Sequence, residues 1–188
     1  VNQSGVIRAR SLTHEDGIVR LDGGDSGQVT LAGTIDASGP ASGQTGGRVS
    51  LLGESVTLTP TARIDVSGAG GGGTALIGGQ FQGRGTEPTA TTTLVADRAS
   101  ISADALTQGT GGTVIVWADG HTQYAGTISA QGGASGGHGG FVEVSGKQAL
   151  DFTGRVDTTA PAGHTGTLLL DPSNITIGLN EKQIPPAG

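Results

Sequence analysis

The side chains that could take part in chemistry include an aspartate that recurs along the sequence. Asp36, Asp65 and Asp157 each follow an Ile or Val in a similar phrase, and Ser102 and Ser129 occupy the matching place in two further copies. Carboxylates stacked in this way could bind calcium through oxygen ligands, but a calcium site takes about six to eight oxygens. Short polar side chains beside turns usually bond the backbone instead. We therefore expect a structural, outward-facing column.

Two histidines show a second regular spacing. His138 and His164 lie four residues before Val142 and Leu168, at the same place in two repeats, so they are expected to be neighbours. A structural zinc site needs four protein ligands and a catalytic site needs three. Because only two histidines converge, the sequence predicts no metal site, and it indicates no cofactor.

Catalysis of other kinds finds little support. Enzymes that act on polysaccharides use paired carboxylates, or a base with cationic partners, and these side chains lie together in one groove. The arginines here occupy unrelated places in the repeats, and the chain has no Cys. The scattered arginines are Arg48, Arg63, Arg84, Arg98 and Arg155. We expect that the chain is not an enzyme, and a polysaccharide-active enzyme is the least favoured function.

Composition excludes several partners. The formal net charge is −6 and no Lys/Arg cluster occurs, so neither nucleic acid nor an anionic membrane is expected to bind. No apolar run reaches the roughly 18 residues of a membrane span. The start at Val1 resembles no signal peptide, and we expect an interior piece whose secretion signal lies upstream.

These groups are positioned by a repeat, which consists of a glycine-rich segment followed by a short strand with alternating apolar residues. Its first alternating residues lie 20, 26, 39, 28 and 26 residues apart, which suits coils of 20–30 residues with one insertion near 81–93. These residues, expected in one inward column, are Val29, Val49, Ala75, Val114, Val142 and Leu168. A second inward column is expected from Ile35, Ile64, Ile101, Ile128 and Val156. A weaker third strand is marked by Leu58, Val95, Thr122 and Leu150.

Three short strands per coil predict an all-β fold, a right-handed parallel β-helix over residues 1–177. Stacked coils bury aliphatic columns that no single coil could bury, which explains how 3% aromatic residues suffice. An antiparallel sandwich of short strands is the alternative, but it does not explain columns in register. Residues 178–188 contain Pro185-Pro186 and are expected to leave the coil as an extended tail.

Alternation also places an unusual set of apolar side chains on the outside. These are Leu52, Leu76, Ile115, Trp117 and Leu169. Either the insertion folds over part of this face, with Phe81 as an apolar anchor, or the face binds a partner. We favour the cover, because an exposed Trp is uncommon without a purpose.

Several phrases resemble one protein family. They are GTIDASG at Gly33–Gly39, GGTVIVWADG at Gly111–Gly120, GTISAQGG at Gly126–Gly133, GGFVEVSGKQALDFTGRVDT at Gly139–Thr158 and TGTLLLDPSNITI at Thr165–Ile177. Together they are similar to the filamentous haemagglutinin-like adhesins, the large exoproteins of two-partner secretion systems. The family's NPNL and NPNGI secretion-domain signatures are missing. The resemblance therefore implies the β-helical shaft that follows the secretion domain.

The resemblance implies a location and partners for the parent protein. It would be secreted by a Gram-negative bacterium to the outer cell surface or the medium, through an outer-membrane β-barrel transporter that does not contact this segment. We expect a structural segment of a stiff extracellular rod or fibre for adhesion or aggregation, directed at a surface receptor or glycan. The alternative is a glycan- or protein-binding module that uses the outward apolar face. End-to-end self-association by β-augmentation is also expected.

Overall fold

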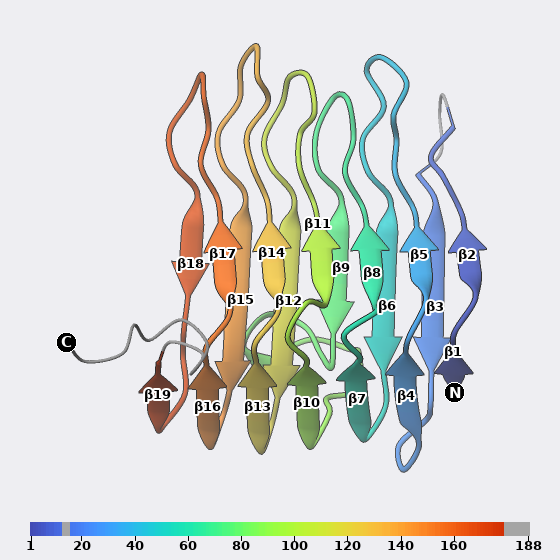
Figure 1. The fold of residues 1–188 in the computed structure, drawn as a ribbon, viewed down its shortest axis with the longest axis vertical. Coiled ribbons are helices and arrows are strands. Elements are labelled where there is room, and N and C mark those ends of the chain that lie inside the picture. The colour runs from blue at the N-terminus through green and yellow to red at the C-terminus, as the bar shows by residue number, and fades with distance from the viewer. Residues whose placement is uncertain (13–15, 179–188) are drawn as a thin grey trace, which may run out of the picture.

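A computed structural model describes residues 1–12 and 16–178 of the chain. These residues form an all-β parallel solenoid of about six turns, in which each coil contributes one strand to each of three parallel sheets. Figure 1 shows the coils side by side, with β1–β3 at one end and β17–β19 at the other. The fold class expected from the repeat is confirmed.

The three sheets run the whole length of the solenoid. The first sheet consists of β1 (Asn2–Gln3), β4 (Gln28–Leu31), β7 (Ser55–Leu58), β10 (Thr92–Val95), β13 (His121–Tyr124), β16 (Ala149–Phe152) and β19 (Ile175–Ile177). The second sheet consists of β2 (Val6–Arg8), β5 (Thr34–Asp36), β8 (Arg63–Asp65), β11 (Ser100–Ser102), β14 (Thr127–Ser129) and β17 (Arg155–Asp157). The third sheet consists of β3 (Ile18–Asp22), β6 (Arg48–Leu52), β9 (Thr74–Ile77), β12 (Thr113–Ala118), β15 (Phe141–Gly146) and β18 (Thr167–Leu169).

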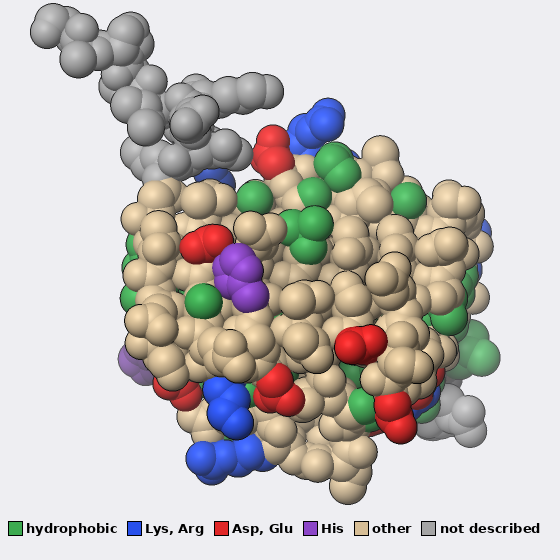
Figure 2. Space-filling view, turned by 90° about the horizontal axis from the view of Figure 1, so that it is seen from below, with side chains coloured by type: hydrophobic (Ala, Val, Ile, Leu, Met, Phe, Trp, Pro, Cys, Tyr) green, Lys and Arg blue, Asp and Glu red, His purple; other side chains and the backbone are tan. Residues whose placement is uncertain are grey.

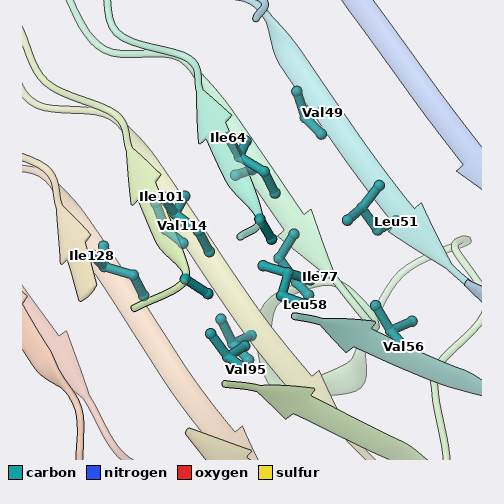
Figure 3. Packing of buried hydrophobic residues seen from close by; sticks show 14 of the residues in the cluster. Val49, Leu51, Val56, Leu58, Ile64, Ile77, Val95, Ile101, Val114 and Ile128 are labelled. Carbon is teal, nitrogen blue, oxygen red and sulfur yellow. The ribbon is translucent and has the colours of Figure 1, made fainter. Parts of the chain in front are cut away.

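The interior between the sheets is an aliphatic core built from equivalent residues of successive coils. In the second sheet Ile35, Ile64, Ile101 and Ile128 pair in sequence and are buried, and Val156 continues the column. This inward column was predicted from the sequence and is confirmed. Figure 3 shows Ile64, Ile101 and Ile128 facing valines and leucines of the other two sheets.

The inward column of the third sheet corrects one sequence assignment. It contains Val49, Ala75, Val114 and Val142 as predicted, and Leu168 continues their register but is 39% exposed in the last described coil. Its first member, however, is Val19, which pairs with Val49, whereas Val29 pairs with Val56 in the first sheet. The error arose because Gly17–Leu21 and Gly27–Leu31 have the same pattern of glycine and alternating residues.

The inward residues of the first sheet were also misaligned. Leu58 pairs with Val95, Val95 with Tyr124 and Tyr124 with Phe152, whereas Thr122 pairs with Leu150 in a separate column. The link from the first sheet to the second is two residues longer after Leu58 and Val95 than after Tyr124. A shift of two residues leaves a side chain on the same face of a strand, so the inward orientation was correct although the register was not.

Glycines before the third-sheet strands are required by the stacking of the coils. A Cβ at Gly112 would lie 2.2 Å from the Gly73 carbonyl oxygen, and one at Gly140 would lie 2.1 Å from the Gly112 carbonyl oxygen. Equivalent backbones approach so closely that a side chain cannot fit. The glycine-rich segment of the repeat therefore marks the corner where each coil enters the third sheet.

The expected insertion and tail have different outcomes. Residues 78–91 connect β9 to β10 and depart from the regular coil. They include a 3₁₀ turn, η1 (Phe81–Gly83), and are called the insertion below. Ile177 ends the last strand, and residues 179–188 of the expected tail lie outside the described residues.

One face of the molecule shows little concentration of charge. Figure 2 shows a face composed mainly of backbone and uncharged polar side chains, with charged side chains in small, separated groups. No helix in the described part of the chain is long and apolar enough to cross a membrane.

Candidate functional site

The outer face of the third sheet, beneath the insertion, carries the candidate site. Leu76, Ile115 and Trp117 form a buried apolar cluster, separate from the interior core, and the half-buried Phe141 packs against it. Phe81 of the insertion contacts Phe141 edge to face, with ring centroids 5.6 Å apart and the rings at 67°. The insertion thus covers apolar side chains that alternation directs outward.

The five outward apolar residues singled out from the sequence do not form one exposed face. Leu76, Ile115 and Trp117 make the covered cluster, Leu52 is fully buried but belongs to neither cluster, and Leu169 is half-buried. Trp117 is only 4% exposed, and its indole nitrogen donates to Asp119 at 3.2 Å.

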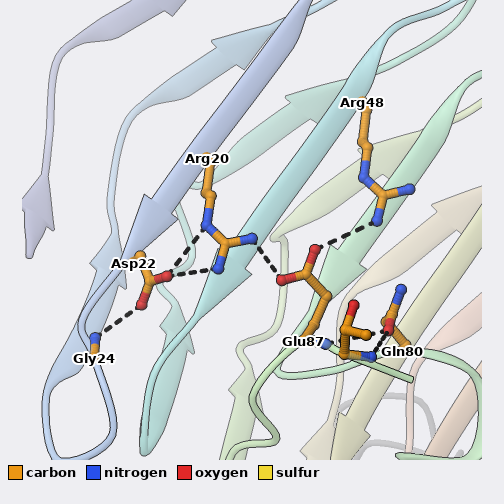
Figure 4. Close-up of polar contacts among 7 residues, drawn as sticks. Arg20, Asp22, Gly24, Arg48, Gln80 and Glu87 are labelled. Carbon is orange, nitrogen blue, oxygen red and sulfur yellow. Dashed lines mark hydrogen bonds and ion pairs between the residues drawn. The ribbon is translucent and has the colours of Figure 1, made fainter. Parts of the chain in front are cut away.

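Ion pairs attach one part of the insertion to the first coils. The Arg20 guanidinium donates to Glu87 at 2.5 Å and to Asp22 at 2.6 Å, and the Arg48 guanidinium lies 3.8 Å from the other Glu87 oxygen (Figure 4). The Gly24 backbone N–H and then Arg20 lower the pKa of Asp22. The insertion therefore bridges back to β3 and β6 through Glu87.

Another part of the insertion is attached to the later coils through Gln82. Its backbone is in the left-handed region at φ 53°, and its N–H donates to Glu143 at 3.0 Å. The Gln82 side-chain amide donates to Asp171 at 3.1 Å. A left-handed non-glycine residue is strained, and these hydrogen bonds help to hold the conformation.

Glu143 is the residue that the sequence interpretation missed. Its side chain has no exposed surface, and burial raises its pKa, while the Gln82 N–H and the Ser145 hydroxyl act in the opposite direction. A signal was available, because Glu143 pairs with Ile115 on one side and Leu169 on the other. A carboxylate between two apolar neighbours of the outward column indicates a polar partner that the repeat itself does not supply.

The fit between the insertion and Trp117 depends on a glycine. Gly83 has φ 62°, and a Cβ at this position would lie 2.6 Å from the Trp117 ring. Thr93 donates its hydroxyl hydrogen to the Trp117 carbonyl oxygen at 2.6 Å. Backbone and ring are therefore packed in direct contact.

Two cavities flank the insertion. One, of about 470 Å³, is polar and is lined by Arg84, Asp119, Lys147 and Asp171 beside Trp117. The other, of about 630 Å³, is mainly apolar and lies against Leu76, Phe81, Ile115 and Phe141, with Arg48 and Arg84 also lining it. We call the second cavity the apolar groove.

The aspartate column follows the expected register. Asp36, Asp65, Ser102, Ser129 and Asp157 pair in sequence. Each aspartate accepts a hydrogen bond from the backbone N–H two residues later, from Ser38 at 3.2 Å, Ser67 at 2.9 Å and Thr159 at 2.9 Å. The column is therefore bonded to its own turns.

Asp36 differs from the other members of the column. Arg8 and Arg10 donate to its carboxylate at 3.2 and 2.7 Å. Burial acts to raise the pKa of Asp36, but hydrogen bonds from Ser38 and Arg10 outweigh it and the net pKa is lowered. This ion pairing ties the first described coil to the second.

His138 and His164 are neighbours on adjacent coils, as predicted. Their rings stack with centroids 5.1 Å apart, and the His164 N–H donates to His138 Nδ1 at 3.0 Å. Among the residues that the structure describes, no three His, Cys, Asp or Glu side chains gather where they could hold a metal ion. The absence of a functional metal stays a prediction.

Comparison with solved structures gives an informative likeness. No model of a protein family and no curated protein matches the sequence. The crystal structure of the HMW1 secretion domain from Haemophilus influenzae superimposes with a TM-score of 0.66 and 26% sequence identity. HMW1 is a two-partner secretion exoprotein. The resemblance to two-partner secretion exoproteins is confirmed.

The extent of the match limits what transfers from that exoprotein. The alignment covers 93% of this chain and 43% of the HMW1 chain, so this chain spans less than half of the solved domain. The matched protein is a secretion domain, whereas the missing NPNL and NPNGI signatures favour a position after such a domain. That position stays a prediction.

Proposed function

We propose that the chain is a structural shaft segment of a large secreted bacterial adhesin. The observation that carries the proposal is the unbroken register of all three sheets through the described coils. Every coil is hydrogen-bonded along three sides to its neighbours, which makes a solenoid stiff along its axis. A stiff rod can hold binding regions away from a cell surface, and we assign no reaction to it.

The likeness to the HMW1 secretion domain supports a secreted location at or beyond the outer surface of a Gram-negative bacterium. The parent protein would cross the outer membrane through a β-barrel transporter, recognised by a domain other than this segment. A host or neighbouring-cell receptor or glycan would be the target of adhesion. End-to-end association through the edges of the first and last coils stays a prediction.

Removing one complete coil from the parent exoprotein tests the shaft role. Deleting residues 140–165 joins Gly139 to Gly166, which takes the place of Gly140 because Phe141 and Thr167 are paired equivalents. A shaft shortened by one coil, about 4.8 Å, should still be displayed and should still support adhesion of the bacteria.

A matched control removes half a coil, residues 140–152, which takes β16 from the first sheet and β15 from the third sheet but leaves β17 of the second sheet in the chain. This variant should fail to be displayed. Normal display of the complete-coil deletion together with loss of adhesion would contradict the shaft role and favour a binding module.

A direct glycan- or protein-binding role is the second candidate. It is favoured by Phe81, which is 46% exposed although it belongs to a covering segment. Under this alternative, Phe81→Ala would reduce adhesion at unchanged display and melting temperature. Under the shaft proposal, the same variant should adhere normally.

A further inference from the structure

The apolar groove beside the insertion has features that are not needed to cover the apolar cluster of the third sheet. Leu76, Ile115 and Phe141 of the third sheet form one side, and Phe81 of the insertion forms another. Its volume of about 630 Å³ lies within the roughly 300–1,000 Å³ of small-molecule sites. An apolar body of one or two rings can therefore contact apolar side chains of both the sheet and the insertion in this open groove.

Two arginine side chains line this apolar groove. The Arg84 side chain makes no hydrogen bond or ion pair with any residue of the described chain, although it lines the groove. The Arg48 guanidinium also lines it and is only loosely paired, at 3.8 Å, with Glu87. Among the described residues that line the groove these two arginines are the only charged ones, so in a chain of net charge −6 this lining selects for an anion.

Gln80 completes the polar edge of the groove. Its side-chain oxygen accepts the N–H groups of Thr86 at 3.0 Å and Glu87 at 3.3 Å, which fixes the side chain (Figure 4). The carboxamide oxygen is therefore occupied within the insertion. The carboxamide nitrogen has no such partner in the described residues and can donate to a ligand.

We infer that the apolar groove binds a small amphiphilic anion, with an aromatic or aliphatic body against Phe81, Phe141 and Ile115 and one carboxylate or sulfonate at Arg84. Apolar burial supplies the affinity, and the guanidinium supplies a charge-assisted hydrogen bond that selects the anion. This site is separate from the shaft role, since no strand pairing depends on it. The occupant is a free small molecule, because the cavity matches such a ligand in size.

Two fluorescent probes of similar shape test the inference. 1-Anilinonaphthalene-8-sulfonate carries one anionic group, and N-phenyl-1-naphthylamine has a similar body without charge. The folded chain should bind the sulfonate saturably with one site. Arg84→Gln should weaken sulfonate binding about tenfold, the loss of one charge-assisted hydrogen bond, and should leave binding of the neutral probe unchanged.

Arg98→Asn is the matched control for loss of charge. Arg98 lies between β10 and β11, outside the groove, and its left-handed backbone at φ 67° suits Asn. This variant should bind both probes as the wild type does. Equal sulfonate affinity in the Arg84 and Arg98 variants would overturn the inference.

Filling the groove separates this site from the apolar edges of the end coils. Thr113 lines the groove at the first outward position of β12, and Thr113→Phe should fill the cavity with a residue that suits a strand. Binding of both probes should be lost while the melting temperature is retained. Unchanged binding in a folded Thr113→Phe variant would place the probes elsewhere and contradict the inference.

Discussion

The interior core and the cluster beneath the insertion are both buried and apolar, but they are organised differently. The core repeats in every coil, so that Ile35, Ile64, Ile101 and Ile128 have equivalent surroundings. Within the described coils, the cluster around Trp117 occurs once and is covered by a segment that the other coils lack. Stability of the core is therefore shared along the solenoid, whereas stability of the cluster depends on a few individual contacts.

A charge in the core should have the largest effect. Ile128→Asp buries an unpaired carboxylate at a fully buried position and should destabilise the fold by more than about 4 kcal/mol. Thr127→Asp is the control, because Thr127 is exposed and pairs with Arg155. Ser129 is a poorer control, since its hydroxyl donates to Asp104 at 2.6 Å. Thermal unfolding followed by circular dichroism measures both, and equal melting temperatures would refute the inside-outside assignment.

Removing the centre of the covered cluster should have a smaller effect. Trp117→Ala leaves a cavity under the insertion and should cost about 3 kcal/mol. The β-sheet signal in circular dichroism should persist at room temperature, because Trp117 faces away from the core ladders. A fully unfolded variant would show that the whole fold depends on this cluster, which would contradict the distinction between the cluster and the core.

The buried carboxylate of the same region should produce a modest dependence on pH. Because the pKa of Glu143 is raised above 4.5, the folded chain retains a proton that the unfolded chain has lost. Stability should therefore fall as pH rises from about 4.5 through the raised pKa, and then level off. Glu143→Gln should remove this fall and gain at most about 1 kcal/mol at neutral pH.

Measuring the melting temperature of both proteins between pH 4 and 8 checks this. The lowered pKa values of Asp22, Asp36 and Asp157 place the loss of their contribution at the acid end of this range and below it, and this loss is common to both proteins. Parallel pH profiles for the wild type and Glu143→Gln would contradict the assignment of the fall to Glu143.

Chelation should have the smallest effect. The aspartates bond their own turns, and the histidine pair supplies only two ligands. Adding EDTA should therefore leave the melting temperature unchanged. A fall that calcium or zinc then reversed would show a metal site in one of these columns.

The difference between the two regions also explains what the sequence could predict. Period-two alternation and repeated glycines predicted the three-stranded coil and the second-sheet column, because each coil repeats the same physical requirement. The predicted register was wrong at Val29 because two stretches of sequence are similar, and at Thr122 because the links between sheets differ in length. In both cases the side chain still faces inward. The contacts of Gln82 and Glu143 could not be predicted, because a left-handed residue in a unique loop sets them.

Native-state hydrogen exchange tests most directly the claim that a shared core carries a separately held insertion. The backbone amides of β6, β9 and β12 should exchange only through global unfolding, and those of residues 80–90 should exchange through local opening at a lower free energy. Trp117→Ala should accelerate exchange in residues 80–90 far more than in β6. Equal opening free energies for the insertion and the core strands would contradict the account.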